Sequence, residues 1–106
     1  MTLVRLRERL DALQNIGRCY GPFPDEQELP YITYKATQQN PVYADGQIVY
    51  ASETVILELV TKRRDFRLEN VIQCILMDEH VIYEMSMDFD EENGIHTATF
   101  TFETED

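Results

Sequence analysis

Histidine and cysteine are the side chains that most often bind a metal or attack a substrate, and this chain has only two of each. His80 and His96 stand at the starts of two expected strands of one hairpin, and the starts of antiparallel strands lie at opposite ends. Cys19 and Cys74 form no CxxC and no metal-ligand spacing, and we expect Cys74 to be a small buried residue on a helix. We therefore predict no metal site and no nucleophilic cysteine.

The acidic segment Asp88–Gly94 resembles the beginning of a calcium-binding loop but departs from it at two required positions. Such a loop needs glycine at its sixth position and a bidentate acid at its twelfth, where Asn93 and Thr99 stand instead. We therefore expect a solvated acidic hairpin tip. No nucleotide-binding, zinc-protease or serine-hydrolase motif occurs in the chain. The sequence thus predicts that the protein is not an enzyme and has no catalytic residue and no cofactor.

Four of the six tyrosines lie between positions 31 and 50, where they could stack on the bases of a single-stranded nucleic acid. The basic side chains that would follow the phosphate backbone are missing, since Lys35 is the only one in this stretch. We expect these tyrosines to pack in a sheet or to line a protein interface, where tyrosine is enriched.

Charge is distributed unevenly along the chain, whose 106 residues fit one domain with a net charge of −11. Every Lys and Arg lies at or before Arg67, with clusters at 5–9 and 62–67, and eleven acidic residues follow. This balance argues against specific nucleic-acid binding, which needs a basic face. It suits head-to-tail contact between copies of the chain, although an unevenly charged solvated surface explains it equally well.

The chain has no apolar run close to the roughly 20 residues of a membrane span, and its N-terminus lacks an apolar signal segment. Together with the two isolated cysteines, these features predict a protein without a membrane partner in a reducing, cytoplasmic setting.

Hydrophobic periodicity predicts the elements of a single domain over residues 1–106. Leucines at helical spacing predict a helix at 2–16, within an N-terminal segment 1–17. Segment 18–29 is rich in proline and glycine and is expected to be a loop. The core, 30–104, is expected to contain strands at 31–37, 47–61, 80–89 and 95–104 and a helix at 66–77 that is capped by Asp65.

The expected element order is α-β-β-α-β-β, and Asn93-Gly94 gives a strong signal for a hairpin between the last two strands. We predict an α+β two-layer sandwich, in which a four-stranded, mainly antiparallel sheet carries both helices on one face. The first two strands are joined by the ten residues 38–47, whereas a hairpin loop usually has about two to five. We expect this long connection to project as an arm against a neighbouring subunit.

The order of these segments resembles the small tail terminator, or tail completion, proteins of long-tailed bacteriophages and prophages. The resemblance covers about residues 28–104 and follows PYITYKAT, YADG, ETVILELVTKRRD and GIHTATFTFET. It implies a structural virion protein at the tail end or head–tail junction, made in the host bacterial cytoplasm. It also implies self-assembly into a ring, often hexameric, that terminates the tail tube and docks the head connector.

The same resemblance implies partners and contact residues. The partners would be further copies of the chain, the tail tube protein and the head completion or connector protein. In the family, the long loop between the first two strands commonly contributes to subunit contacts, and the turn before the helix often carries charged residues. We therefore predict an oligomer interface formed by Gln39, Asn40, Pro41, Val42, Tyr43, Asp45, Lys62, Arg63, Arg64 and Arg67.

Two other hypotheses remain open from the sequence. The acidic C-terminal half could mimic nucleic acid and occlude a DNA-binding protein, because Glu84, Asp88 and Asp90 share one face of a strand. Such a chain would be a small regulatory binding protein. The third hypothesis is an enzyme with a carboxylate-based or metal-assisted site.

Overall fold

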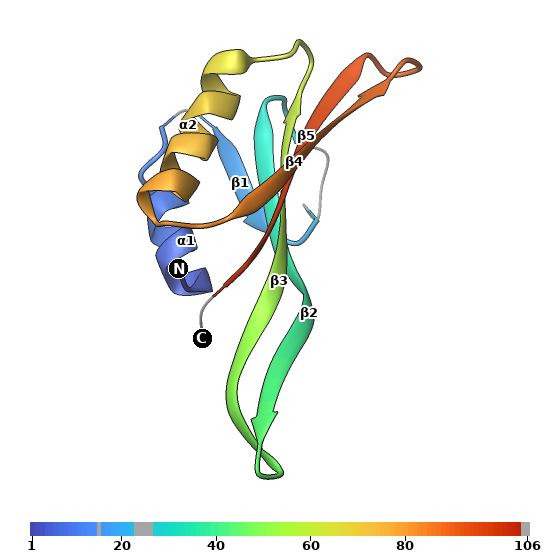
Figure 1. Cartoon of the computed structure of the whole chain (residues 1–106). Coiled ribbons are helices and arrows are strands. Elements are labelled where there is room, and N and C mark those ends of the chain that lie inside the picture. Colours follow the sequence, from blue (N-terminus) through green and yellow to red (C-terminus); the bar gives the residue numbers. More distant parts are fainter. Residues whose placement is uncertain (15, 23–26, 105–106) are drawn as a thin grey trace.

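The computed structural model of the chain describes residues 1–14, 16–22 and 27–104, without the side chains of 38–39, 42–44 and 48–51. Both helices lie on one face of a twisted sheet, and one hairpin extends far beyond the rest of the molecule (Figure 1). The elements are α1 (Leu3–Asp11), β1 (Gly17–Tyr20), β2 (Tyr31–Ala44), β3 (Gln47–Thr61), α2 (Phe66–Asp78), β4 (Tyr83–Asp90) and β5 (Ile95–Glu103).

The sheet of the described residues has five strands in the order β1-β2-β3-β5-β4. β1 runs parallel to β2, and the other neighbouring strands are antiparallel. The fold is α+β with two helices, but the predicted four-stranded, mainly antiparallel sheet and its element order were wrong. The sheet is mixed because Gly17–Tyr20, which we had assigned to the N-terminal segment and loop, pairs with the first residues of β2.

Side-chain contacts explain why β1 forms where the sequence predicted a helix end and a loop. The Arg18 guanidinium donates hydrogen bonds to the carbonyl oxygens of Asp11, Leu13 and Ile16, and so satisfies backbone acceptors just after α1. The helix therefore ends at Asp11 instead of residue 16. At the other end of β1, the ring of Tyr20 packs edge-on against Tyr34, with 5.4 Å between ring centroids.

The predicted long connection at 38–47 was also wrong, because both strands continue through it. β2 extends to Ala44 and β3 begins at Gln47, so that only Asp45 and Gly46 form the turn. Their φ values of 52° and 75° lie in the left-handed region that a tight two-residue hairpin turn requires. The expected projecting arm is therefore a continuous two-stranded hairpin and not a loop (Figure 1).

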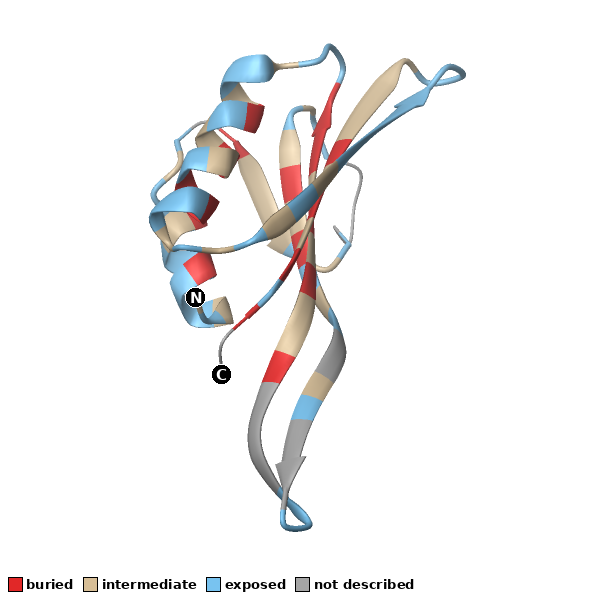
Figure 2. Ribbon diagram, viewed as in Figure 1, coloured by how far each residue is buried: buried red, intermediate tan, exposed pale blue. Residues whose placement is uncertain are grey.

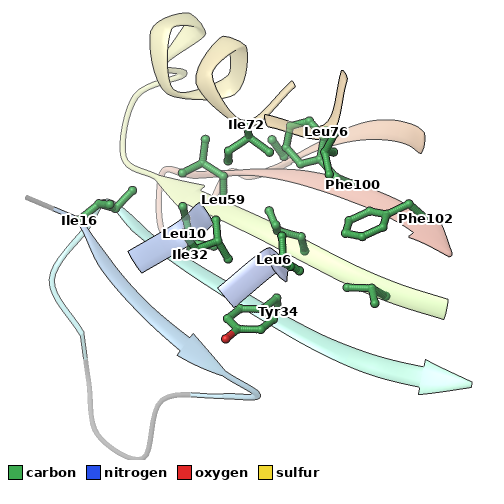
Figure 3. Close-up of a cluster of buried hydrophobic side chains, with 13 residues drawn as sticks. Leu6, Leu10, Ile16, Ile32, Tyr34, Leu59, Ile72, Leu76, Phe100 and Phe102 are labelled. Carbon is green, nitrogen blue, oxygen red and sulfur yellow. The ribbon is translucent and has the colours of Figure 1, made fainter. Parts of the chain in front are cut away.

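The core lies between the helices and the sheet, where Figure 2 shows most of the buried residues. Leu6 and Leu10 of α1, together with α2, cover alternate residues of the central strands (Figure 3). Leu57 and Phe100 are directly paired across β3 and β5, and both are fully buried. Because successive side chains of a strand point to opposite faces, the apolar residues gather on the face that the helices cover, and the other face has no helix.

Two caps fix the ends of α2 and set the start of β4. The Asp65 carboxylate accepts a hydrogen bond of 3.0 Å from the amide of Leu68, as the sequence predicted for a cap at this position. At the other end, His80 has a φ of 57°. The amides of His80 and Val81 donate to the carbonyls of Met77 and Leu76, which is a Schellman arrangement. Because His80 ends the helix in this way, β4 begins at Tyr83 and not at residue 80.

Phe100→Ala is expected to lower the free energy of unfolding by about 3–5 kcal/mol, because it leaves a cavity in the centre of the core. Thr99→Ala is the matched control, since Thr99 points to the face of the sheet without helices and should cost less than about 1 kcal/mol. Urea denaturation followed by circular dichroism measures both. Equal losses of stability in the two variants would contradict this assignment of the core.

Candidate interaction surfaces

The first candidate surface is the arm, which we define as residues 39–53 of the β2–β3 hairpin. Pairing of β5 with β3 stops at the Thr54–Glu103 pair, and pairing of β1 with β2 stops at Tyr34. Beyond these points β2 and β3 have only each other as neighbours among the described strands, from Gln39–Glu53 to the turn. A two-stranded ribbon is marginally stable by itself in water, so such an arm gains stability from further contacts.

The base of the arm is tied to the last strand by side-chain and backbone hydrogen bonds. Asn40 Nδ2 donates to Thr54 Oγ1 at 2.9 Å and to Glu103 Oε1 at 3.4 Å. The amide of Glu53 donates to Thr104 Oγ1 at 3.1 Å, and the Thr104 amide donates back to the Glu53 carbonyl at 2.9 Å. The arm thus leaves the sheet in a fixed direction. No local pattern in the sequence indicates this role of Glu103 and Thr104, because the role depends on where β5 ends.

The predicted interface residues of this region are at different places along the arm. Asn40 is at the base, Pro41 is exposed on β2, and Asp45 is exposed in the turn. The side chains of Gln39, Val42 and Tyr43 lie outside the described residues, so their place in an interface stays a prediction.

The second candidate surface is the basic corner, which we define as residues 62–67 at the junction of β3 and α2. Lys62, Arg63 and Arg67 are exposed, and none of them has an acidic partner within 4.0 Å among the described residues. Arg64 differs, because its guanidinium pairs with Glu69 and lies 4.4 Å from the centre of the Phe66 ring. Of the four predicted basic contact residues, three are therefore free to meet a partner.

Arg64 has a structural role that the charge pattern did not reveal. Arg64 Nε and Nη2 donate to the two carboxylate oxygens of Glu69 at 3.2 and 3.3 Å. Glu69 is 4% exposed, so this bidentate contact takes the place of water around its carboxylate. No sequence signal beyond the spacing of five residues marks the pair.

The third candidate surface is the acidic tip of the β4–β5 hairpin. Asp90 accepts hydrogen bonds from the amides of Glu92 and Asn93 and from the Asn93 side chain. These donors, chiefly the Asn93 side chain, lower the pKa of Asp90, because they stabilise its ionised form. The carboxylate of Asp90 therefore holds its own turn, while Asp88, Glu91 and Glu92 remain exposed.

The histidines and cysteines, which are the residues most able to bind a metal or attack a substrate, do not form one site in the structure. His80 ends α2, whereas His96 stands at the opposite end of the β4–β5 hairpin, with its ring 4.5 Å from that of Phe89. Cys74 is exposed on α2, so the expectation that it is buried was wrong. Across the described parts of the chain, no three His, Cys, Asp or Glu side chains come together as a metal site would require.

The tyrosines do not form one stacking platform. Tyr34 is buried under α1, and this burial raises the pKa of its hydroxyl, because the charged form would lose its hydration. Tyr31 is three residues away in the same strand and faces the other side of the sheet. The side chains of Tyr43 and Tyr50 lie outside the described residues.

A surface hollow of about 540 Å³ lies beside the base of the arm. Its lining mixes apolar and polar side chains, among them Ile82, Tyr83 and Glu103, and includes one histidine, His80. No cysteine or second histidine joins them, so the hollow does not bring together the groups of a typical active site.

Comparisons with known proteins give no relative for this chain: no protein-family model matches it, and no curated protein is significantly similar. In the described part of the chain, neither helix has the length and apolar character needed to cross a membrane.

Arg64→Ala is expected to lower the free energy of unfolding by about 1–3 kcal/mol, because it leaves the buried Glu69 carboxylate without its partner. Arg63→Ala is the matched control and should change stability by less than about 0.5 kcal/mol, since Arg63 is exposed and has no ion pair among the described residues. Chemical denaturation of both variants measures the difference. A loss as large for Arg63→Ala as for Arg64→Ala would refute the structural role of the Arg64–Glu69 pair.

Proposed function

We propose that this protein is a self-assembling structural component of a long-tailed phage or prophage tail. Its copies form a closed ring at the tail end or head–tail junction, which terminates the tail tube and docks the head connector. The observation that carries the proposal is the arm, a tied two-stranded hairpin that extends away from the domain (Figure 1). The described core cluster lies between the helices and the part of the sheet outside the arm.

The composition of the arm supports a role in protein contact. Between residues 39 and 53 the charged side chains are Asp45 and Glu53, while two tyrosines, two valines and an isoleucine occur. Depletion of charge and enrichment in tyrosine are typical of the centre of protein interfaces. Because the base is fixed by hydrogen bonds to β5, less flexibility is lost when the arm binds.

A ring follows if the arm binds a different surface on a neighbouring copy. Such a contact is heterologous, and repeated heterologous contacts close into a ring or continue as a filament. The specific station in the phage tail rests on the resemblance of residues 28–104 to tail terminator proteins. The tail tube protein and the head completion protein are therefore proposed as the neighbours on the two sides of the ring.

The nucleic-acid mimic finds less support in the arrangement of carboxylates. Glu84, Asp88 and Asp90 form a single row along β4, and Asp90 is occupied by its own turn. A mimic of duplex DNA would need two rows at the spacing of phosphates. No observation on the described residues favours this function over assembly.

The purified wild-type chain is expected to form a closed oligomer with a defined mass, or one whose mass rises with concentration to a plateau. Replacing residues 40–52 by Asn-Gly, which joins the paired Gln39 and Glu53 through a two-residue turn, should give a folded monomer. Native mass spectrometry and sedimentation velocity measure the masses, and circular dichroism checks the fold. A wild-type chain that stays monomeric at high concentration, also with added tail-tube protein, would overturn the proposal.

Tyr43→Ala tests the arm without changing its length. We expect this variant to fold normally and to associate about 10-fold more weakly, because truncating an interfacial tyrosine commonly costs more than 1 kcal/mol. Thr99→Ala, on β5 and outside the arm and the other two candidate surfaces, is the control and should assemble like the wild type. Normal folding and normal assembly of Tyr43→Ala would remove Tyr43 from the contact.

A further inference from the structure

The end of the β4–β5 hairpin carries apolar side chains that no helix covers. Met87 and Phe89 stand on the same face of β4 as Tyr83 and Met85, which pack against the core. Farther along the strand, Met87 is 36% and Phe89 is 49% exposed, and the Phe89 ring stacks on His96. Figure 2 shows that this part of the hairpin is exposed or half-buried. We call Met87, Phe89 and His96 the hairpin face.

Acidic side chains surround the hairpin face. Asp88, Glu91 and Glu92 are exposed, and no basic residue lies within 4.0 Å of them among the described residues. An apolar centre with a charged rim is the composition of a protein docking site. Its partner must therefore present an apolar side chain among positive charges.

The basic corner of the same chain has these properties. Phe66 is 66% exposed there, beside the unpaired Lys62, Arg63 and Arg67. Within one molecule the two surfaces lie at the same end of the sheet, because Thr61, directly before Lys62, pairs with His96 of the hairpin face. No ion pair among the described residues joins them. Each copy thus carries one surface beside its complement.

We propose that the hairpin face of one copy docks on the basic corner of the next copy. Phe66 packs against Met87 and Phe89, and the lysine and arginines face the acidic rim. This contact rests on the proposed self-assembly and adds a second interface to that of the arm. It also restricts the relative orientation of two copies, because two basic corners or two acidic hairpins repel each other.

Two charge-reversed variants test this contact. Arg63→Glu/Arg67→Glu gives a chain with two acidic surfaces, and Glu91→Lys/Glu92→Lys gives a chain with two basic surfaces. Each variant alone should associate at least about 10-fold more weakly than the wild type, because like charges then face each other. An equimolar mixture should assemble again, since every acidic surface can meet a basic surface of the other chain. Sedimentation velocity at low salt measures all four samples, with the wild type as reference.

The matched control reverses the same amount of charge elsewhere. Arg7→Glu/Lys35→Glu changes the net charge as Arg63→Glu/Arg67→Glu does, and both control residues are exposed and lie outside the two surfaces. The control variant should assemble like the wild type. Assembly of a wild-type chain that persists in both reversed variants, or a mixture that stays dissociated, overturns this contact and leaves the arm interface standing. A wild-type monomer overturns both proposals.

Discussion

The pairing of β3 with its two neighbours is the constraint on which the rest of the structure depends. β3 pairs with β2 along its whole length, but β5 reaches only from Thr54 to Thr61. The part of β3 beside β5 supplies Val55, Leu57 and Leu59 to the core, where the helices cover them. Among the described elements, no helix and no third strand lies beside the part without β5, so this part continues as a two-stranded ribbon with β2. One strand thus forms both the centre of the domain and half of its arm.

The charged side chains also fall into two classes. Some form ion pairs that join elements of the domain, and others are exposed without such a pair among the described residues. Arg5 and Arg9 of α1 contact Glu79 and Asp78 beside the end of α2, which joins the two helices. The Glu79 carboxylate, through a hydrogen bond and its charge, raises the pKa of Arg5, as expected for a contact that favours the ionised guanidinium. At the opposite end of α2, Lys62, Arg63 and Arg67 have no such partner among the described residues, whereas Arg64 pairs with Glu69. These three cations and the exposed carboxylates of the β4–β5 hairpin remain available for contact between molecules.

The sequence predicted the regular core well, because its signals are local. The strand at 47–61, the cap at Asp65 and the helix that follows it are confirmed. β1 was missed because four residues among glycines and prolines carry no periodic signal, and its pairing partner is more than ten positions away. The arm was expected as a loop, because Thr37–Asn40 is polar and Pro41 argues against a strand.

The candidate surfaces were predictable only in part, for a similar reason. The basic corner is visible in the sequence as a run of charge. The pairing of Arg64 with Glu69 cannot be seen in the sequence, because it depends on the burial of Glu69. The alternation of apolar residues along β4 predicts one buried face. Met87 and Phe89 are nevertheless exposed, because α2 does not cover this part of the sheet. Such information lies in the tertiary structure and not in the local pattern.

Hydrogen–deuterium exchange of the arm at increasing protein concentration tests the central claim most directly. A two-stranded ribbon without further contacts should exchange its amides rapidly, whereas an arm held against a neighbouring copy should be protected. Peptides covering 39–53 are expected to become strongly protected as the oligomer forms, while peptides from α2 and β5 change little. Exchange of the arm that stays rapid and equal at all concentrations would contradict it.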